Sequence, residues 1–190
     1  MSKVILDMSM SLDGFIAKAN NDDGGLHHWV FGGTHPLEAG GITFQLTSEN
    51  SAKVFGDFVE RVGAFIVGRK SLIAGSEEPF FQLPTFVLTH SERQSDDKRI
   101  TFVTDGIESA LEQAQAIANG KAIYIGGGAD VAQQYLRAGL IDELHINLVP
   151  VIFGEGLRLF DNLSDNTIKL QKLSVIEGDD VTHIQYRMVN

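Results

Sequence analysis

The feature that most constrains the fold is a short apolar strand that runs into three consecutive glycines and then into a helix. The strand covers residues 122–125, the glycines are Gly126, Gly127 and Gly128, and a helical pattern starts at Ala129. Glycines at a helix start leave backbone N–H groups open to a ligand beside the positive end of the helix, which makes an anion site. A plain turn would account for one glycine but not easily for three, so we interpret the run as a phosphate-binding turn.

Two common nucleotide-binding motifs do not fit this run. Val131 occupies the position of the third glycine in the dinucleotide fingerprint of doubly wound enzymes, and no lysine follows as it would in a P-loop. The prediction of a phosphate site therefore rests on backbone groups rather than on either motif.

The order of the strands predicts the fold class. We expect strands at residues 4–10, 14–17, 64–67, 85–88, 100–103, 122–125, 143–153, 169–176 and 181–188. Strands and helices alternate in the first part of the chain, and strands follow one another in the last part. This order predicts a single α/β domain over residues 1–190, with a largely parallel sheet and an antiparallel C-terminal edge.

Helices are expected at residues 48–61, 69–74, 105–120 and 129–138, and three of them have end signals. Ser48 or Asn50 would cap the first helix. Asp105 and Glu108 form a capping-box pattern at the third, and Gly139 would end the fourth in the C′ position.

Six glycines lie between Gly24 and Gly41, in a segment from residue 18 to about residue 47 that has little periodicity. A loop of that length in a compact domain is usually functional or mobile, and a disordered insertion is the alternative. The only tryptophan, Trp29, lies in this segment. It would either cover a flat ligand or anchor the loop on the core.

Metal and thiol chemistry are not expected. His27, His28 and His35 lie near two aspartates, but adjacent histidine side chains diverge and no ligand spacing is present. The chain has no cysteine, which excludes disulfides, thiolate metal sites and a cysteine nucleophile.

The net charge of the chain limits the classes of binding partner that we expect. The chain carries 15 Lys and Arg against 25 Asp and Glu, a formal charge of −10. Such a chain repels nucleic acid and anionic membranes, so we expect neither as a partner and expect any phosphate to be held by a local site. The first residues reach Asp7 without a cleavage signal, and no apolar run approaches the length of a membrane span, which favours a cytoplasmic protein.

Two further strand ends carry groups that suit an anion. They are Gly68, Arg69, Lys70 and Ser71 after residues 64–67, and Leu88, Thr89 and His90 at the end of residues 85–88. The carboxyl ends of parallel strands meet at one edge of a sheet, where open α/β folds bind their ligands. A solvated basic face is the alternative for the two cations.

Six motifs, taken in order, resemble those of a known superfamily. They lie at residues 11–17, 66–71, 86–89, 123–128, 142–145 and 150–156. Each is weak alone, but together they resemble the dihydrofolate-reductase-like superfamily, and most closely the reductase domain of the bifunctional riboflavin-biosynthesis deaminase-reductase and its stand-alone relatives. The resemblance implies a mostly parallel sheet of about eight strands flanked by helices. It also implies NADPH as the cofactor and a homodimer as the assembly.

The resemblance assigns residues to the cofactor. The pyrophosphate would lie on Gly126, Gly127 and Gly128, approached by Arg69, Lys70 and Ser71. The adenosine ribose would lie beside Thr89 and His90. The nicotinamide would be bordered by Ser9, Ala17 and Trp29, under a lid formed by residues 18–29. The other expected cofactor contacts are Gly68, Leu88, Ile125, Ala129 and Val131.

Three departures from the family pattern narrow the function. Ala52 occupies the position of the catalytic acid in dihydrofolate reductase proper, so classical dihydrofolate reduction is disfavoured. Ala129 stands where a phosphate-binding arginine often follows the glycines. The Cys-x-x-Cys zinc ligands of a fused deaminase are not in the chain, which has no cysteine.

We therefore expect an NADPH-dependent reductase that transfers hydride to a small heterocycle, carbonyl or imine. By the resemblance, the first candidate substrate is 5-amino-6-(5-phosphoribosylamino)uracil, and an unrelated small carbonyl or imine fits the sequence equally well. Asp13 and Arg158 are candidate substrate-binding residues, with a turn residue and a surface ion-pair partner as the alternatives. Dihydrofolate reductase activity and a non-catalytic NADP-binding module remain alternative functions, and no residue is assigned as the proton donor.

Overall fold

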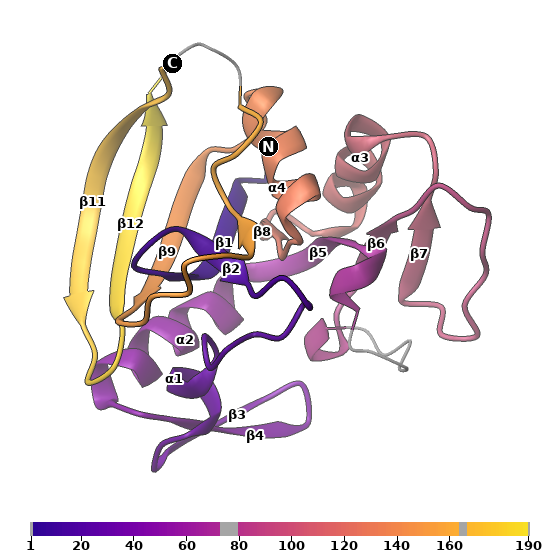
Figure 1. Ribbon diagram of the computed structural model, residues 1–190. Coiled ribbons are helices and arrows are strands. Elements are labelled where there is room, and N and C mark those ends of the chain that lie inside the picture. Colours follow the sequence, from indigo (N-terminus) through magenta and orange to yellow (C-terminus); the bar gives the residue numbers. More distant parts are fainter. Residues whose placement is uncertain (1, 73–79, 164–166, 190) are drawn as a thin grey trace.

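An eight-stranded sheet forms the centre of the computed structural model, which describes residues 2–72, 80–163 and 167–189. The strand order is β11-β12-β9-β1-β8-β5-β6-β7 (Figure 1). The strands are β1 (Val4–Ser11), β5 (Val62–Gly68), β6 (Thr85–Leu88), β7 (Ile100–Val103), β8 (Ala122–Ile125), β9 (Glu143–Val149), β11 (Lys169–Glu177) and β12 (Thr182–Val189). From β9 to β7 all neighbours are parallel, and β12 and β11 join antiparallel at one edge. The predicted fold class is confirmed.

Helices cover both faces of the sheet because strand side chains alternate. Ile5 of β1 belongs to a cluster that includes Phe58 of α2 (Glu49–Arg61). The next residue, Leu6, belongs to a different cluster with Ala110 of α3 (Ile107–Ile117) and Tyr135 of α4 (Ala129–Arg137). Helix α2 therefore packs on one face of the sheet, and α3 and α4 pack on the other (Figure 1).

The ends of the helices follow the sequence signals with one exception. The Ser48 hydroxyl accepts a hydrogen bond from the Ser51 N–H and caps α2, as predicted. Gly139 has φ +66°, and its N–H and that of Leu140 bond back to the Leu136 and Tyr135 carbonyls, the pattern of a Schellman C-cap.

The predicted capping box at Asp105 does not form. Gly106 is the N-cap of α3, with φ +108° and no side-chain cap bond, so the helix starts at Ile107 and Asp105 stays exposed before it. The glycine turns the chain sharply into the helix, which leaves the Asp105 carboxylate out of reach of the first N–H groups.

The segment between residues 18 and 47 is not the aperiodic loop that its sequence suggests, nor a disordered insertion. It contains α1 (His28–Phe31) and a hairpin of β3 (His35–Ala39) and β4 (Ile42–Leu46). Gly40 and Gly41, with φ +58° and +78°, form the two-residue turn, whose positive φ values favour glycine. The hairpin lies beside α1 and α2 and packs a separate cluster of apolar side chains (Figure 1).

Three more boundaries differ from the sequence prediction. Strand β9 stops at Val149 because Pro150 cannot donate to a ladder, so residues 150–153 leave the sheet. The strand predicted over residues 14–17 is β2 (Phe15–Ala17), and it pairs with an unpredicted β10 (Leu157–Arg158). The helix expected over residues 69–74 is a 3-10 turn, η1 (Arg69–Ser71), and its last two positions lie outside the described residues; η2 (Phe80–Gln82) precedes β6.

Gly33 sets how closely the hairpin approaches α1, which can be tested by adding one methyl group. A Cβ at Gly33 would lie 2.0 Å from the Leu46 carbonyl oxygen and 2.4 Å from the Thr47 Cα. Both are backbone atoms, so relieving the clash requires the chain to move. We expect Gly33→Ala to lower the free energy of unfolding by about 1–3 kcal/mol, measured by urea denaturation. The control is Gly56→Ala in α2, where the new Cβ meets only Leu37 Cδ1 at 3.5 Å. This control should be neutral or stabilising by up to about 1 kcal/mol, and equal losses in both variants would contradict the packing argument.

Candidate functional site

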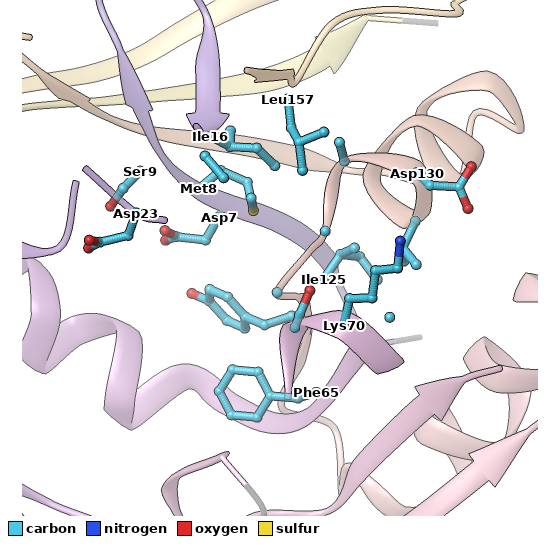
Figure 2. A pocket seen from close by; sticks show the side chains of 18 of the residues that line it. Asp7, Met8, Ser9, Ile16, Asp23, Phe65, Lys70, Ile125, Asp130 and Leu157 are labelled. Carbon is cyan, nitrogen blue, oxygen red and sulfur yellow. The ribbon is translucent and has the colours of Figure 1, made fainter. Parts of the chain in front are cut away.

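A cleft of about 1380 Å³ opens at the carboxyl ends of the parallel strands. Residues at the ends of β1, β5, β6 and β8 line it, together with the start of α4 and part of the segment before the hairpin. Figure 2 shows Asp7, Met8 and Ser9 at one end of the cavity, with Lys70 and Asp130 at the other. The cleft therefore lies where open parallel sheets bind their ligands.

The glycine turn joins the ends of β5 and β8 at close range. The Gly68 N–H donates to the Gly127 carbonyl at 2.7 Å, and the Gly126 N–H donates to the Ile66 carbonyl at 3.0 Å. Gly127 has φ +96°, and the peptide bond between Gly127 and Gly128 is cis. A Cβ on Gly68 would lie 3.1 Å from Val131 Cγ2, and one on Gly128 would lie 3.3 Å from Ser71 Oγ. The glycines thus let two strand ends and the start of α4 approach one another.

Most of the residues expected to contact a cofactor come together in this cleft. Those that line it are Ser9, Ala17, Trp29, Gly68, Arg69, Lys70, Ser71, Leu88, Thr89, His90, Ile125, Gly126, Gly128, Ala129 and Val131. Gly127 does not line the cleft, since its carbonyl is turned toward Gly68. Segments far apart in the sequence therefore form one concave surface.

The two candidate substrate residues have different positions. Arg158 lines the cleft, with its guanidinium 4.3 Å from the centre of the Phe15 ring and 3.1 Å from the Asp13 carbonyl, to which it donates. Asp13 does not line the cleft. Its carboxylate accepts hydrogen bonds from the Ser11 hydroxyl and from the N–H groups of Phe153 and Gly154. These hydrogen bonds, that from Ser11 foremost, lower the pKa of Asp13 to about 2. The bonds from Phe153 and Gly154 show that Asp13 holds the 153–154 loop, as a turn residue would.

Trp29 anchors its segment on the core and also forms part of the cleft wall. Its side chain is buried, its indole N–H donates to Ser9 Oγ at 3.0 Å, and its ring packs edge-on against Phe55 and His183. Trp29 therefore anchors its loop on the core, and its place in the cleft wall leaves contact with a ligand as a prediction.

A buried polar chain leads from α2 to the cleft, and sequence reasoning missed it. The Ser51 hydroxyl is 3.0 Å from His183 Nε2, His183 Nδ1 is 2.7 Å from Asn147 Oδ1, and Asn147 Nδ2 is 2.8 Å from Asp7 Oδ1. The amide oxygen of Asn147 can only accept, so His183 Nδ1 carries the proton and Nε2 accepts from Ser51. The available signal was a carboxylate inside an apolar run, Asp7 after residues 4–6.

The polar chain requires His183 to be neutral. His183 is 1 % exposed, and burial lowers its pKa to about 4, although Asp7 and Asp180 act in the opposite direction. A second proton on the ring would remove the acceptor that Ser51 uses. The hydrogen-bond geometry and the lowered pKa therefore agree.

At the other end of β9, Glu143 is buried between two cations. Burial alone would raise its pKa, but hydrogen bonds and charge from Lys3 and Arg61 outweigh it and lower the pKa to about 2. His145 lies between this carboxylate and the cleft, with Nε2 3.3 Å from Glu143 Oε2 and Nδ1 3.5 Å from Asp7 Oδ2.

The hydroxyl of Tyr124, at the Asp7 end of the cleft, has no hydrogen-bond partner among the described residues. Tyr124 is 1 % exposed and packs edge-on against Phe58. Burial, and after it the nearby Asp7 carboxylate, raises the pKa of Tyr124, so the hydroxyl keeps its proton. A buried hydroxyl without a partner costs about 1–3 kcal/mol, which a ligand heteroatom could recover.

Neither a metal cluster nor a membrane-spanning helix is present in the described part of the chain. No three His, Asp or Glu side chains there converge to hold a metal ion; His27 pairs instead with Asp23 at 3.1 Å. No helix there is long and apolar enough to cross a membrane.

Sequence comparison identifies the family. The family described as the RibD C-terminal domain matches residues 2–184. The chain belongs to this family. Two similar proteins are YwjB and YyaP of Bacillus subtilis (strain 168). YwjB is 27 % identical over 169 residues, which cover 87 % of this chain and 86 % of YwjB. YyaP is 26 % identical over 174 residues, covering 83 % and 80 %.

Solved structures of RibD-like and dihydrofolate-reductase proteins share the fold. A putative riboflavin biosynthesis protein from Shewanella sp. PV-4 superposes over the full length of both chains with a TM-score of 0.74 and 23 % identity. A dihydrofolate reductase from Enterococcus faecalis in complex with NADP(H) has a TM-score of 0.64 and 18 % identity, covering 99 % of this chain and 97 % of its own. A diaminohydroxyphosphoribosylaminopyrimidine deaminase/5-amino-6-(5-phosphoribosylamino)uracil reductase from Thermotoga maritima has a TM-score of 0.66 and 16 % identity, and this chain covers 57 % of it. The suspected superfamily is confirmed.

The neutral state of His183 makes stability depend on pH in a defined window. The folded pKa, about 4, lies below the unfolded value of 6.5, so the unfolded chain binds the extra proton first as the pH falls. We expect the free energy of unfolding to drop by up to about 3 kcal/mol between pH 6.5 and 4, measured by urea denaturation. The carboxylates whose pKa is lowered, Asp13, Asp23, Glu49, Asp97 and Glu143, change the free energy of unfolding only below about pH 4.5.

The matched variants are His183→Asn, which should flatten the slope between pH 4.5 and 6.5, and His90→Asn at an exposed position, which should keep it. A slope that survives in His183→Asn would mean that another group titrates in this window.

Proposed function

We propose that this chain is an NADPH-dependent reductase that works as a single domain over residues 1–190. The supporting observation is the cleft itself, where the glycine turn after β8, the cations after β5 and the polar end of β6 come together. The family membership supports the reductase class, and the fold is the one found in a dihydrofolate reductase that binds NADP(H).

The residues of the cleft fit the cofactor group by group. Arg69 and Lys70 are exposed cations at the mouth of the cleft, suited to phosphate oxygens, and the glycine turn presents backbone at the start of α4. Thr89 and His90 lie at the end of β6, where an adenosine ribose would sit beside them. Ser9 and Trp29, joined by their hydrogen bond, would border the nicotinamide. When bound, NADPH supplies the hydride, and the chain orients the substrate and excludes water from it.

For the substrate we propose a compound with a C=N or C=O group, with 5-amino-6-(5-phosphoribosylamino)uracil as the first candidate. The Thermotoga maritima protein carries this substrate in its name, and its structure shares the fold. Arg158 on the cleft wall would suit an anionic substrate group. Dihydrofolate is the second candidate because of the common fold, but Ala52 on α2 offers no acid.

Nucleotide binding gives the first test. We expect NADPH to bind with a micromolar Kd and NADH to bind less tightly. Both titrations are monitored by the change in nicotinamide fluorescence. The variant Arg69→Ala should raise the Kd for NADPH by about tenfold or more, because a charge-assisted hydrogen bond to phosphate is lost. Lys121→Ala, an exposed cation away from the cleft, is the control.

A second variant tests the glycine turn. Gly127→Val would place a branched side chain at φ +96° and 3.2 Å from Met8 Cε, so binding should be abolished while circular dichroism reports the folded state. Failure of both nucleotides to bind below about 1 mM, a difference of ~4 kcal/mol from a micromolar site, would overturn the proposal.

We also propose a homodimer formed through the edge of the sheet. Edge strand β11 exposes Leu170, Leu173 and Val175, and β12 exposes Val189. Exposed apolar side chains on an edge strand favour association. Light scattering after size exclusion should give about twice 20.7 kDa, and Val175→Glu should give the monomer. Ile117→Glu on α3 is the control for an added charge at an exposed apolar site, and a wild-type monomer would contradict the proposal.

A further inference from the structure

The proposed reduction leaves one chemical requirement unassigned, the source of a proton. Hydride addition to C=N or C=O pushes an electron pair onto nitrogen or oxygen, and that atom must be protonated. The helix position that would supply an acid carries Ala52. A donor supplied by the protein must therefore lie on another element that reaches the same end of the cleft.

Asp7 is the acidic group on the sheet at that end. It lies two residues before Ser9 on β1, so both side chains face the same side of the sheet and their Cα atoms are about 7 Å apart. Figure 2 shows the Asp7 carboxylate projecting from β1 into the cavity on the side of Ser9, away from Lys70. Asp23, the other carboxylate at this end, is half exposed and bonded to His27.

The carboxylate of Asp7 is held in a fixed orientation. Oδ1 accepts from the Asn147 amide, and that amide cannot flip without losing its bond from neutral His183. Oδ2 lies 3.5 Å from His145 Nδ1, too far for a good hydrogen bond, and so keeps capacity for a ligand. The Asp7 side chain is 23 % exposed, which gives it access to solvent protons.

The surroundings of Asp7 suit a small polar centre inside an apolar ring. Phe55, Phe58 and Phe65 line this end of the cleft, and Tyr124 adds its unpartnered hydroxyl from β8. A flat substrate could pack against the aromatic side chains and place its heteroatoms toward Asp7 and Tyr124. Two groups that otherwise need explanation then serve one ligand: a carboxylate in a buried strand, and a hydroxyl that has no partner among residues 2–72, 80–163 and 167–189.

We propose that Asp7 is the proton donor of the reduction and that Asn147 is the residue that positions it, an inference that rests on the proposed reductase function. The substrate carbon of the C=N bond gains the hydride, the π electron pair moves onto nitrogen, and that nitrogen takes the proton of the Asp7 carboxyl group. A C–H and an N–H bond form, the cofactor is oxidised, and the substrate is reduced. The Asp7 carboxylate takes up this proton from solvent before the transfer and is a carboxylate again after it.

The test is single-turnover hydride transfer, followed by loss of NADPH absorbance. The probes are 5-amino-6-(5-phosphoribosylamino)uracil, dihydrofolate, the cyclic imine 1-pyrroline and an aromatic aldehyde. With any probe that the wild-type protein reduces, Asp7→Asn should slow hydride transfer about 10²- to 10⁴-fold while the Kd for NADPH stays unchanged. Asp57→Asn, an exposed carboxylate on α2 outside the cleft, should keep the wild-type rate.

Two further variants separate proton donation from a structural role. Formate should restore part of the rate to Asp7→Ala, because a small acid can occupy the vacated space, and should not restore Asp7→Asn. Asn147→Ala should slow hydride transfer by itself but add little to Asp7→Asn, because both act through one carboxylate.

The outcomes distinguish the two proposals. If Asp7→Asn reduces a probe at the wild-type rate, the role of Asp7 is overturned and the reductase function stands. Additive effects of the Asp7 and Asn147 variants would overturn the positioning role. If the wild-type protein binds NADPH and reduces none of the probes, the proposed reductase function is overturned, and the role of Asp7 with it.

Discussion

The hydrogen bond from the Gly68 N–H to the Gly127 carbonyl is the contact on which the site depends. It joins the ends of two neighbouring parallel strands at 2.7 Å, and the glycine at position 68 also leaves room for α4, because a Cβ there would lie 3.1 Å from Val131 Cγ2. The start of α4 and the cations of η1 are thereby brought to one edge of the sheet. An anion site can then be built from backbone and two side chains in a chain that is otherwise strongly acidic.

The two faces of the sheet have different chemistry. The face under α3 and α4 is an apolar core. The face under α2 buries Asn147, His183 and Ser51, which are satisfied by one another and end on Asp7 at the cleft. Buried polar groups are costly unless each has its partner, so such a chain holds its members in one geometry. The rigid chain lies beside the cleft, where a reacting group needs a fixed orientation.

Sequence signals predicted helix ends and strands correctly where the conformation depends only on residues nearby in the chain. The Ser48 cap, the Gly139 C-cap and the strand before the glycines depend on neighbours within a few residues. The capping box at Asp105 failed because Gly106 offers a competing conformation. The hairpin after α1 was missed although its strands alternate, because each strand has only five residues and lies in a segment whose six glycines suggest a loop. The position of Asp7 in the cleft could not be predicted from the sequence, because its partner Asn147 lies 140 residues away.

The sequence by itself determined the order of the eight strands of the main sheet and of the helices that cover it, the glycine turn and the family, since these follow from periodicity, backbone freedom and motif order. Only the tertiary structure decided which polar side chains share the cleft. It turned Asp13 away to hold a loop, brought Arg158 to the wall, and joined Asp7 to Asn147 and His183. The reason is physical: the parallel sheet sets distant strands about 5 Å apart, and only this pairing decides which side chains meet.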